Sequence, residues 1–395
     1  MKITHIHNKG IMTRSIHAGV KIDPTTRAVK PPLVMSNNYA LPTTEGIANP
    51  TTWEAEFVYV RDGSPNARAL EERIMVLEGI SYAEGMECVV TSSGVSAICG
   101  AFLALVNTGE HVVASNIAYG SVLTMLSDYF PNRFGIKTTL VDSSNPENIQ
   151  KALTPQTKLI HIETPGNPTT RISDIAAIAR IARQAGVILS VDSTWSGLTT
   201  QHPLELGADL VMHSLTKYIN GHGDAAGGAV LGPKALIDVI RRFAVKDMGG
   251  CISPFNAWQI MRGMATLPLR MDRHNHNALQ VAEFLEQHPK VAWVRYPALR
   301  SHPDHHVALR QMHGFSGMLN FDIKGDPRQH GAVLNRLEIF THATCLGHDE
   351  SLIAVYCDPS DGAQAQPFYR VSIGLEDAED LIADLDQALS IVKTD

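Results

Sequence analysis

The sequence predicts an α/β fold with a large, mainly parallel sheet domain and a smaller α+β domain behind it. Between about residues 65 and 254, short segments that are apolar throughout alternate with helical patterns. Strands of this kind are buried on both faces, as in a parallel sheet covered by helices. From residue 255 the pattern changes to a long helical segment, alternating strands and a closing helix. A chain of 395 residues is long enough for both domains.

We expect three regions along the chain. Residues 1–60 are polar and interrupted by prolines, which indicates an N-terminal arm that contacts a neighbouring subunit. Residues 61–254 are expected to form the large α/β domain, and residues 255–395 the α+β domain. The second domain is expected to contain one long helix over 254–288, strands near 317–323 and 369–377, and a last helix over 379–392.

The helices of the large domain carry clear start and stop signals. A helix is expected over 65–78, because Pro65 suits a first turn and Gly79 suits a stop. Another is expected between Ser173, a candidate N-cap, and Gly186. The strands between such helices are expected at 87–91, 110–115, 157–163, 187–192 and 208–214.

Composition excludes several classes of function. The net charge is −7 at pH 7 and there is no cluster of basic residues, so we expect no nucleic-acid partner. No apolar segment is long enough to cross a membrane and the N-terminus does not resemble a signal peptide, so we expect a cytoplasmic protein. The five cysteines are scattered, which indicates reduced thiols, and the 18 histidines lack the spacing of a metal site.

Chemically distinctive residues follow the expected strands, where ligands bind in open α/β sheets. They are Ser93, Gly94 and Val95; Tyr119; Asn167; Asp192; and Ser214, Thr216 and Lys217. No G-x-G-x-x-G pattern follows the first strand, which argues against a dinucleotide enzyme. Each residue alone has an ordinary explanation, such as a helix cap or a solvated lysine. Their occurrence at successive strand ends favours a common ligand.

A phosphorylated aromatic aldehyde would use all of these residues. The helix start at Ser93–Val95 suits a phosphate, with hydroxyl donors from Ser214 and Thr216. Asp192 could keep a ring nitrogen protonated, Tyr119 could stack on the ring, and Lys217 could form a Schiff base.

Longer motifs make the prediction more specific. SLTKYINGHGD (214–224), VDSTW (191–195), ETPGNPT (163–169), AYGS (118–121) and YRVSIGLED (369–377) resemble the Cys/Met-metabolism family of pyridoxal-phosphate (PLP) enzymes. The resemblance extends over about residues 12–393. Within the family, residues 245–274 are most similar to methionine γ-lyases, followed by cystathionine lyases and cystathionine γ-synthases.

The resemblance implies a type I PLP fold and a homotetramer of two catalytic dimers. It implies Lys217 as the Schiff-base lysine, Asp192 as partner of the pyridine nitrogen and Tyr119 as the stacking ring that also acts at the leaving group. Gly94, Val95, Ser214 and Thr216 would bind the phosphate, together with Tyr59 and Arg61 from the neighbouring subunit. Asn167 would lie near the ring hydroxyl, and Arg370 would bind the substrate α-carboxylate.

Three positions and one segment depart from the family pattern and concern the substrate. Ser64 and Ser121 replace an asparagine and a cysteine, Cys345 replaces the serine before the LG turn, and the segment 353–368 is shortened. We therefore expect γ-elimination from an L-amino acid whose leaving group differs from that of methionine, giving a small fragment and a keto acid or homoserine-type product.

A polar or cationic leaving group, as in canavanine, would suit acidic residues near the substrate, namely Asp349 and, beside Trp53, Glu54 and Glu56. Solvated surface carboxylates are an equally good interpretation of these residues. The alternatives are a cystathionine β-lyase, a γ-replacement enzyme (cystathionine γ-synthase or homoserine sulfhydrylase), and an inactive binding protein of the same fold.

Overall fold

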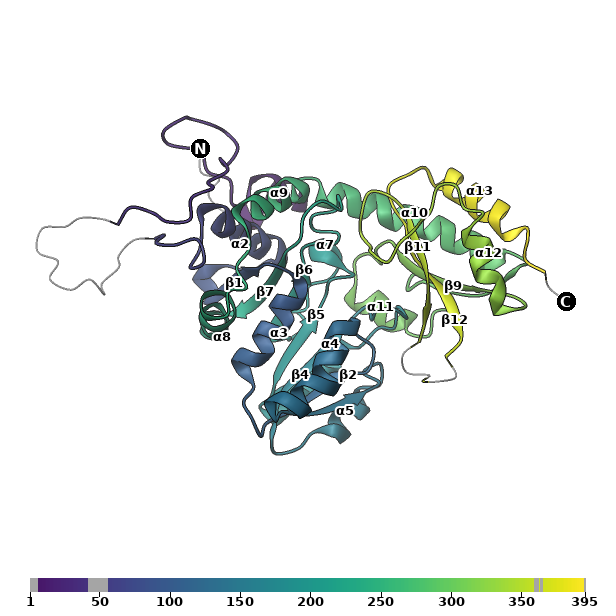
Figure 1. The fold of residues 1–395 in the computed structure, drawn as a ribbon, viewed down its shortest axis with the longest axis horizontal. Coiled ribbons are helices and arrows are strands. Elements are labelled where there is room, and N and C mark those ends of the chain that lie inside the picture. The colour runs from purple at the N-terminus through teal and green to yellow at the C-terminus, as the bar shows by residue number, and fades with distance from the viewer. Residues whose placement is uncertain (1–5, 42–55, 359–361, 363–364, 394–395) are drawn as a thin grey trace, which may run out of the picture.

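The computed structural model describes residues 6–41, 56–358, 362 and 365–393, which form two domains joined by a long helix (Figure 1). The larger domain contains a seven-stranded sheet in the order β1-β7-β6-β5-β4-β2-β3. All its neighbouring pairs are parallel except those made by β7, which runs antiparallel to both β1 and β6. Its strands are β1 (Met86–Thr91), β2 (His111–Ser115), β3 (Lys137–Val141), β4 (Thr157–Glu163), β5 (Ile188–Asp192), β6 (Leu210–Ser214) and β7 (Gly228–Pro233).

Helices cover both faces of this sheet, as expected for strands that are apolar throughout. One face packs against α3 and α8, and the other packs against α6. The helices of this domain are α1 (Ile11–His17), α2 (Pro65–Glu78), α3 (Gly94–Leu105), α4 (Gly120–Thr124), α5 (Pro146–Ala152), α6 (Ile175–Ala185), α7 (Gly197–Thr200), α8 (Lys234–Ile240) and α9 (Pro254–Met264). Short helical segments of other types lie at Ile6–Asn8, Tyr82–Glu84, Met125–Phe134 and Arg241–Asp247. The predicted mainly parallel α/β domain is confirmed.

The smaller domain has a five-stranded sheet in the order β10-β11-β12-β9-β8, covered by helices. Its strands are β8 (Val291–Arg295), β9 (Met318–Ile323), β10 (Thr341–His342), β11 (Leu352–Cys357) and β12 (Pro367–Ser372). Its helices are α10 (Leu267–Gln287), α11 (His305–Gln311), α12 (His330–Leu334) and α13 (Ala378–Leu389), with a 3-10 turn at Pro327–Gln329. This is the predicted α+β arrangement.

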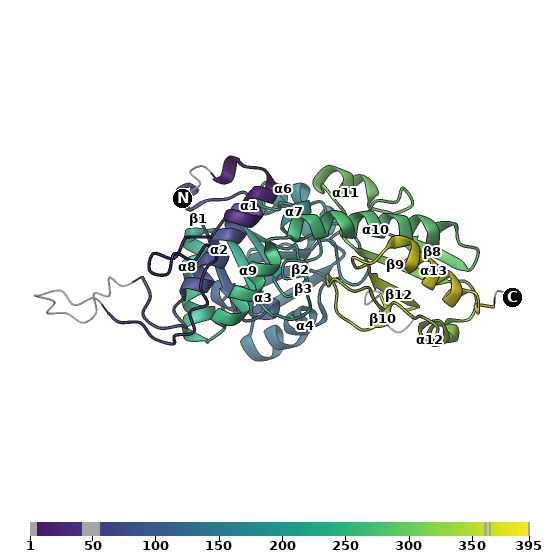
Figure 2. The ribbon, with the colours of Figure 1, turned by 90° about the horizontal axis from the view of Figure 1, so that it is seen from above.

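Helix α10 connects the two cores (Figure 2). Leu267 and Met271, near its start, pack in a cluster with α2 and α9, whereas Ala278 and the residues after it pack in the core of the smaller domain. The first part of α10 therefore belongs to the core of the large domain, and the later part belongs to the core of the smaller domain. The boundary at residues 254/255 stays a prediction.

Two helix predictions were wrong in detail. The helix expected over 254–288 is interrupted at Ala265 and Thr266, because Pro268 lies in the first turn of a new helix, α10. The N-cap of α6 is Asp174 rather than Ser173, since the Asp174 side chain accepts a hydrogen bond from the N–H of Ala177. The cap of α2 is Ser64, with Pro65 in the first turn and Gly79 in the left-handed conformation at the stop.

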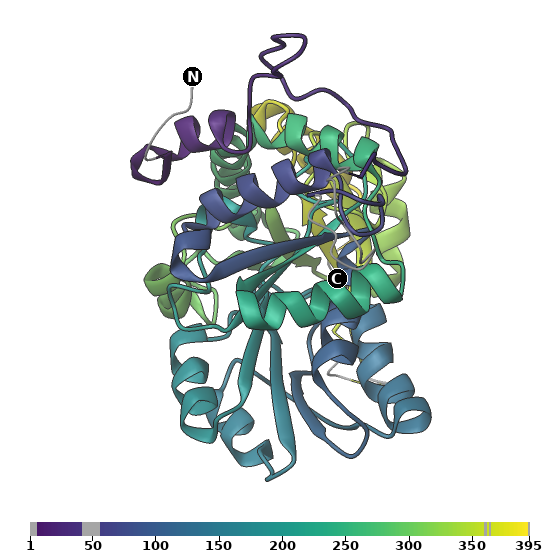
Figure 3. The same ribbon diagram turned by 90° about the vertical axis from the view of Figure 1, so that its left-hand side faces the viewer.

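Helix α1 of the N-terminal arm packs beside α2 of the large domain, whereas residues 21–30 are largely exposed (Figure 3). Arg14 donates a hydrogen bond to the carbonyl of Val76 at the end of α2, and the Trp258 indole of α9 donates one to the carbonyl of Pro31. Contact of the arm with a neighbouring subunit stays a prediction.

Candidate active site

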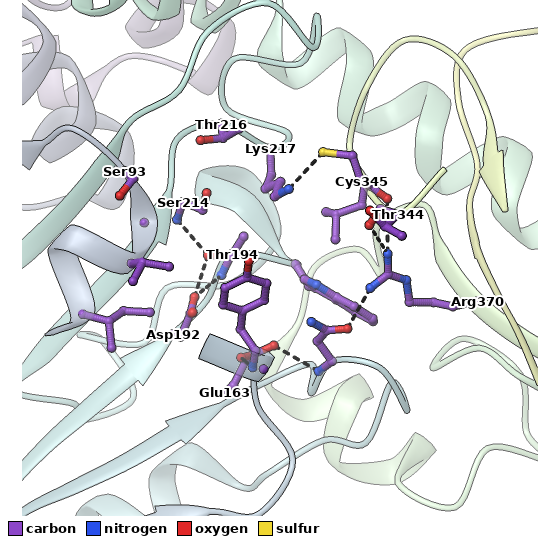
Figure 4. Close-up of a pocket in the computed structure, with 18 of the residues that line it drawn as sticks. Ser93, Glu163, Asp192, Thr194, Ser214, Thr216, Lys217, Thr344, Cys345 and Arg370 are labelled. Atoms are coloured by element: carbon purple, nitrogen blue, oxygen red, sulfur yellow. Dashed lines mark hydrogen bonds between the residues drawn. The ribbon is translucent and has the colours of Figure 1, made fainter. Parts of the chain in front are cut away.

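A cavity of about 520 Å³ lies where the large-domain strands end and the smaller domain begins (Figure 4). The structure brings together eleven of the predicted site residues around it: Ser93, Gly94, Val95, Tyr119, Asn167, Asp192, Ser214, Thr216, Lys217, Cys345 and Arg370. The large domain supplies the residues up to Lys217, and the smaller domain supplies Cys345 and Arg370.

One end of the cavity is built to receive an anion. Ser93 caps α3 by accepting a hydrogen bond of 3.1 Å from the N–H of Ser96. Gly94 follows and packs on the end of β6: a Cβ at this position would lie only 2.7 Å from Cβ of Ser214. The glycine thus lets the N-terminus of α3 approach the hydroxyl group of Ser214, and Thr216 lines the same cavity. Helix N–H groups beside two hydroxyl groups form a suitable phosphate site.

Asp192 ends β5 with its carboxyl group buried in the cavity wall. Burial raises its pKa to about 6, against the effect of Thr194, whose N–H and hydroxyl group both donate to Oδ1, at 3.0 and 2.6 Å. The Thr194 hydroxyl in turn accepts a hydrogen bond of 2.8 Å from the N–H of Ser214. These bonds fix the orientation of the carboxylate and favour its charged form.

Glu163 is a second buried carboxyl group, and the sequence assigned it no role. It ends β4 directly opposite Asp192 in the strand register. Its two oxygens accept hydrogen bonds from the N–H groups of Tyr119 (2.7 Å) and Asn167 (3.0 Å). Burial, and then the nearby Asp192, raise the pKa of Glu163 well above its usual value. Glu163 therefore holds the backbone of two predicted cofactor-binding residues.

Lys217 lies in the turn after β6, where its Nζ donates a hydrogen bond of 2.9 Å to Sγ of Cys345. Burial would raise the pKa of the Cys345 thiol, but hydrogen bonds from His348 and Lys217 outweigh it and lower that pKa to about 6. A thiol with this pKa is largely ionised at neutral pH.

Arg370, on β12, faces the cavity from the smaller domain. Its guanidinium group donates to Oδ1 of Asn167 at 2.8 Å and to the carbonyls of Thr344 and Cys345. It also lies over the Tyr356 ring, 4.0 Å from the centroid. Burial lowers the pKa of Arg370 from its usual value. Because these acceptors are uncharged, the positive charge of the guanidinium group is not neutralised by them and can pair with the carboxylate of a ligand.

This donor set fits pyridoxal phosphate. The α3 terminus with Ser214 and Thr216 would hold its phosphate, the buried Asp192 carboxylate would hold its ring nitrogen, and Lys217 would bind its aldehyde. The close approach of α3 to β6 across Gly94 forms the cradle that a phosphate needs.

Comparison with known proteins agrees with this geometry. The family model for Cys/Met metabolism PLP-dependent enzymes matches residues 12–390. This chain belongs to that family. Its cofactor is pyridoxal phosphate, and it is a PLP-dependent lyase of the trans-sulfuration group whose class of reaction is γ-elimination. The predicted family, type I fold and cofactor are confirmed.

Individual relatives cover nearly the whole chain. A canavanine γ-lyase of Rhizobium leguminosarum bv. trifolii is 42% identical and aligns over 96% of both chains. An L-methionine γ-lyase of Treponema denticola is 39% identical over 98% of this chain and 99% of its own. The crystal structure of metB from Corynebacterium glutamicum superposes with a TM-score of 0.90 at 35% identity, covering 98% of this chain and 99% of that one.

Some predicted residues lie away from the cavity. Tyr59 is exposed and stacks with Arg61, whose guanidinium carbon lies 5.4 Å from the ring centroid. Arg61 lines a separate hollow beside Arg241 and Lys246. Their proposed role in a neighbouring subunit's site stays a prediction.

Of the acidic residues predicted to face the substrate, Asp349 and Glu56 are not brought to the cavity. Asp349 is exposed and does not line it, although its carbonyl accepts a hydrogen bond from Leu375. Glu56 is exposed, while Trp53 and Glu54 lie outside the described residues.

The sequence did not single out several residues of the site. Thr194, Trp195, Thr344 and Tyr356 line the cavity with no role assigned beforehand, and His348 contacts Cys345 from behind. Thr194 and Trp195 lie within the VDSTW motif, which was the available signal. Among the described residues, no helix is long and apolar enough to span a membrane, and no cluster of residues suits a metal ion.

Proposed function

We propose that this lyase removes a guanidinooxy group from the γ-carbon of an L-amino acid, as in L-canavanine. The observation that carries the proposal is a single cavity that contains a buried guanidinium (Arg370), an amine (Lys217) and a buried carboxyl group (Asp192). The similarity to a canavanine γ-lyase supports the guanidinooxy leaving group.

Each side chain has a role that suits its position. Arg370 binds the α-carboxylate of the substrate, because it lines the cavity and Asn167 and Thr344 hold two of its nitrogens in place. Lys217 takes the α-proton and then moves a β-proton. Bound pyridoxal phosphate supplies an electron-withdrawing ring that accepts the electron pair of the broken C–H bond. Asp192 keeps the ring nitrogen protonated, and Tyr119 stacks on the ring.

The leaving group departs as hydroxyguanidine when the bond between Cγ and the oxygen breaks. Protonation of that oxygen by Tyr119 or Lys217 completes the step. Addition of water to the remaining four-carbon unit gives homoserine, whereas full elimination gives a keto acid and ammonia. Methionine γ-elimination is the second candidate, supported by the 39% identity to a methionine γ-lyase.

A substrate panel tests the proposal. Purified enzyme is supplied with canavanine, methionine, homocysteine, cystathionine or O-acylhomoserine, with and without added cysteine, and the keto acid, homoserine and released fragment are measured. We expect canavanine to release hydroxyguanidine independently of cysteine. Rapid turnover of cystathionine with inert canavanine would reject the guanidinooxy substrate, and cysteine-dependent product would indicate γ-replacement.

The assigned role of Lys217 has its own test. Lys217→Ala should abolish the visible absorbance of the lysine-bound cofactor and lower kcat by about 10³-fold, since one positioned acid–base group contributes roughly 10² to 10⁴. Arg370→Lys keeps the charge but loses the two-pronged contact, so it should raise KM and leave the absorbance unchanged.

We also propose a homotetramer in the cytoplasm, in which Tyr59 and Arg61 of one subunit reach the phosphate of another. Sedimentation would measure the assembly. Mixing Arg61→Ala subunits with Lys217→Ala subunits would test the sharing: activity should return in the mixture if complete sites form between the two kinds of subunit.

A further inference from the structure

Cys345 belongs to a cluster that the reaction described above does not use. Its Sγ accepts a hydrogen bond of 2.9 Å from Lys217 Nζ on one side and contacts His348 on the other. Nδ1 of His348 also lies 3.2 Å from Oε1 of Glu350. Lysine, thiol, imidazole and carboxylate therefore follow one another from the cavity to the surface.

The backbone holds this cluster rigidly against Lys217. A Cβ at Gly347 would lie 2.6 Å from the backbone nitrogen of Tyr218, so the turn after Cys345 rests directly on the Lys217–Tyr218 peptide. A Cβ at Gly223 would lie 3.0 Å from Nδ1 of His348, so the glycine loop after Lys217 packs on the imidazole ring. The His348 side chain is only 11% exposed.

The side chain and the backbone of Cys345 serve different partners. Its carbonyl accepts a hydrogen bond from Arg370 on β12, which helps to orient the predicted carboxylate-binding group. Its sulfur points instead to Lys217. The other ionisable groups near the sulfur are Arg370 and Tyr356 on β11. Burial raises the pKa of Tyr356, which is therefore neutral at neutral pH, so the charges around the sulfur are the cations Lys217, His348 and Arg370, which favour a negative sulfur.

We propose that Cys345 is a thiolate that acts as the counter-ion of Lys217, with His348 as the positioning residue that keeps the sulfur ionised. This inference rests on the proposed function, because it concerns the proton that Lys217 takes from the substrate. When the substrate C–H bond breaks, the proton forms a new N–H bond and the amine becomes an ammonium ion. A fixed negative charge 2.9 Å away stabilises that developing positive charge.

Three variants separate charge from packing. Cys345→Ser keeps the size and a hydrogen bond but removes the charge, whereas Cys345→Asp restores a negative charge. His348→Asn keeps a polar side chain but cannot become an imidazolium. Cys357→Ser, at the exposed end of β11, is the matched control for loss of a thiol elsewhere.

The ionisation of Cys345 is measured first, by the ultraviolet difference spectrum of the thiolate between the wild-type holoenzyme and Cys345→Ser as the pH is raised. We expect a midpoint clearly below the ordinary thiol value of about 8.5, and a higher midpoint in the His348→Asn background. A midpoint above about 8, or one that His348→Asn does not move, would overturn the proposal.

The effect on catalysis is measured with α-deuterated substrate. In Cys345→Ser we expect kcat to fall about tenfold, KM to change less than about threefold, and the isotope effect to rise, because proton removal becomes slower. Cys345→Asp should recover part of the loss, and Cys357→Ser should match the wild type. An unchanged isotope effect in Cys345→Ser would reject the counter-ion role.

The two measurements also separate this proposal from the assignment of the substrate. The thiolate titration needs no substrate, so an enzyme that is inactive on canavanine but has an ionised Cys345 would refute the substrate alone. The isotope effect can be measured with whichever amino acid the enzyme accepts.

Discussion

Glu163 and Asp192 are two buried carboxyl groups on neighbouring strands, and they have different surroundings. Both have raised pKa values because of burial, but Asp192 receives two hydrogen bonds from Thr194 that stabilise its charge. Two adjacent buried carboxyl groups do not both ionise easily, so the proton resides on Glu163 and the charge on Asp192. The charged partner is the one that a protonated ring nitrogen requires.

Replacing Thr194 should move the acid side of the pH–activity profile. With a pKa near 6, Asp192 loses its charge as the pH falls through about 6, and activity falls with it. Thr194→Val removes the hydroxyl donor and raises that pKa further, so the acid limb of kcat should shift upward by roughly one pH unit. Thr194→Ser keeps the donor and should behave as the wild type. A Val variant with an unshifted profile would show that Asp192 does not control the limb.

Helix α3 and strand β6 are in close contact at Gly94. The predicted phosphate site therefore depends on the absence of a side chain at this position. In Gly94→Ala the new Cβ would lie 2.7 Å from Cβ of Ser214 and would push the helix start away. We expect the Kd for pyridoxal phosphate to rise about tenfold or more, since overpacking costs roughly 1 to 3 kcal/mol.

The matched control for this change is Gly120→Ala, another glycine of the cavity wall, where a Cβ would meet nothing within 4 Å. Titration of cofactor-free enzyme with pyridoxal phosphate, followed by absorbance, gives both constants. Equal affinities in the two variants would show that close packing at Gly94 does not matter for binding.

The end of helix α2 carries a pH-dependent element of stability. Glu78 is fully buried, and its Oε2 lies 3.8 Å from Nδ1 of His202, an ion-pair distance too long for a hydrogen bond. Burial raises the pKa of Glu78, and the Glu78 carboxylate raises that of His202 against the effect of burial. The folded protein thus binds more protons than the unfolded chain above the ordinary values of 4.5 and 6.5.

We therefore expect the free energy of unfolding to fall as the pH rises above these values. Urea unfolding at pH 6 and pH 8.5 measures the difference. Glu78→Gln combined with His202→Asn should flatten this dependence, whereas His202→Asn alone should destabilise the protein by about 3 kcal/mol at pH 7, because it leaves a buried carboxylate unpaired. An equally steep dependence in the double variant would assign it to other groups.

The elements that sequence patterns predicted are those with strong local signals. Strands β1, β2, β4, β5 and β6 each contain a short apolar run and were predicted. Strand β3 was missed because KTTLV is a partly exposed edge strand with polar residues, and β7 because GAVLGP contains two glycines and a proline. The interruption between α9 and α10 depends on a single proline within a continuous helical pattern, which is a weak signal.

In the whole molecule, the cavity lies between two domains. The site residues of the large domain could be predicted from the sequence more completely than those of the smaller domain. The cofactor side comes from strand ends of the large domain, where short motifs place Lys217, Asp192 and Ser214 at predictable positions. The substrate side comes from Thr344, Cys345, Tyr356 and Arg370 of the smaller domain, which converge only through tertiary packing. Glu163 and His348 were missed for a related reason. The role of Glu163 depends on its contact with Tyr119, and that of His348 on the contact between Cys345 and Lys217, and both contacts join residues that are distant in the sequence.

The guanidinooxy leaving group is tested by a comparison of canavanine with arginine. The two amino acids have nearly the same shape, but arginine has a methylene group where canavanine has the γ-oxygen, so arginine has no heteroatom to eliminate. We measure kcat/KM for canavanine and methionine, and the inhibition constant of arginine. We expect kcat/KM to be at least about tenfold higher for canavanine than for methionine, and we expect arginine to be a competitive inhibitor that is not consumed. A preference for methionine, with no inhibition by arginine, would contradict the guanidinooxy leaving group.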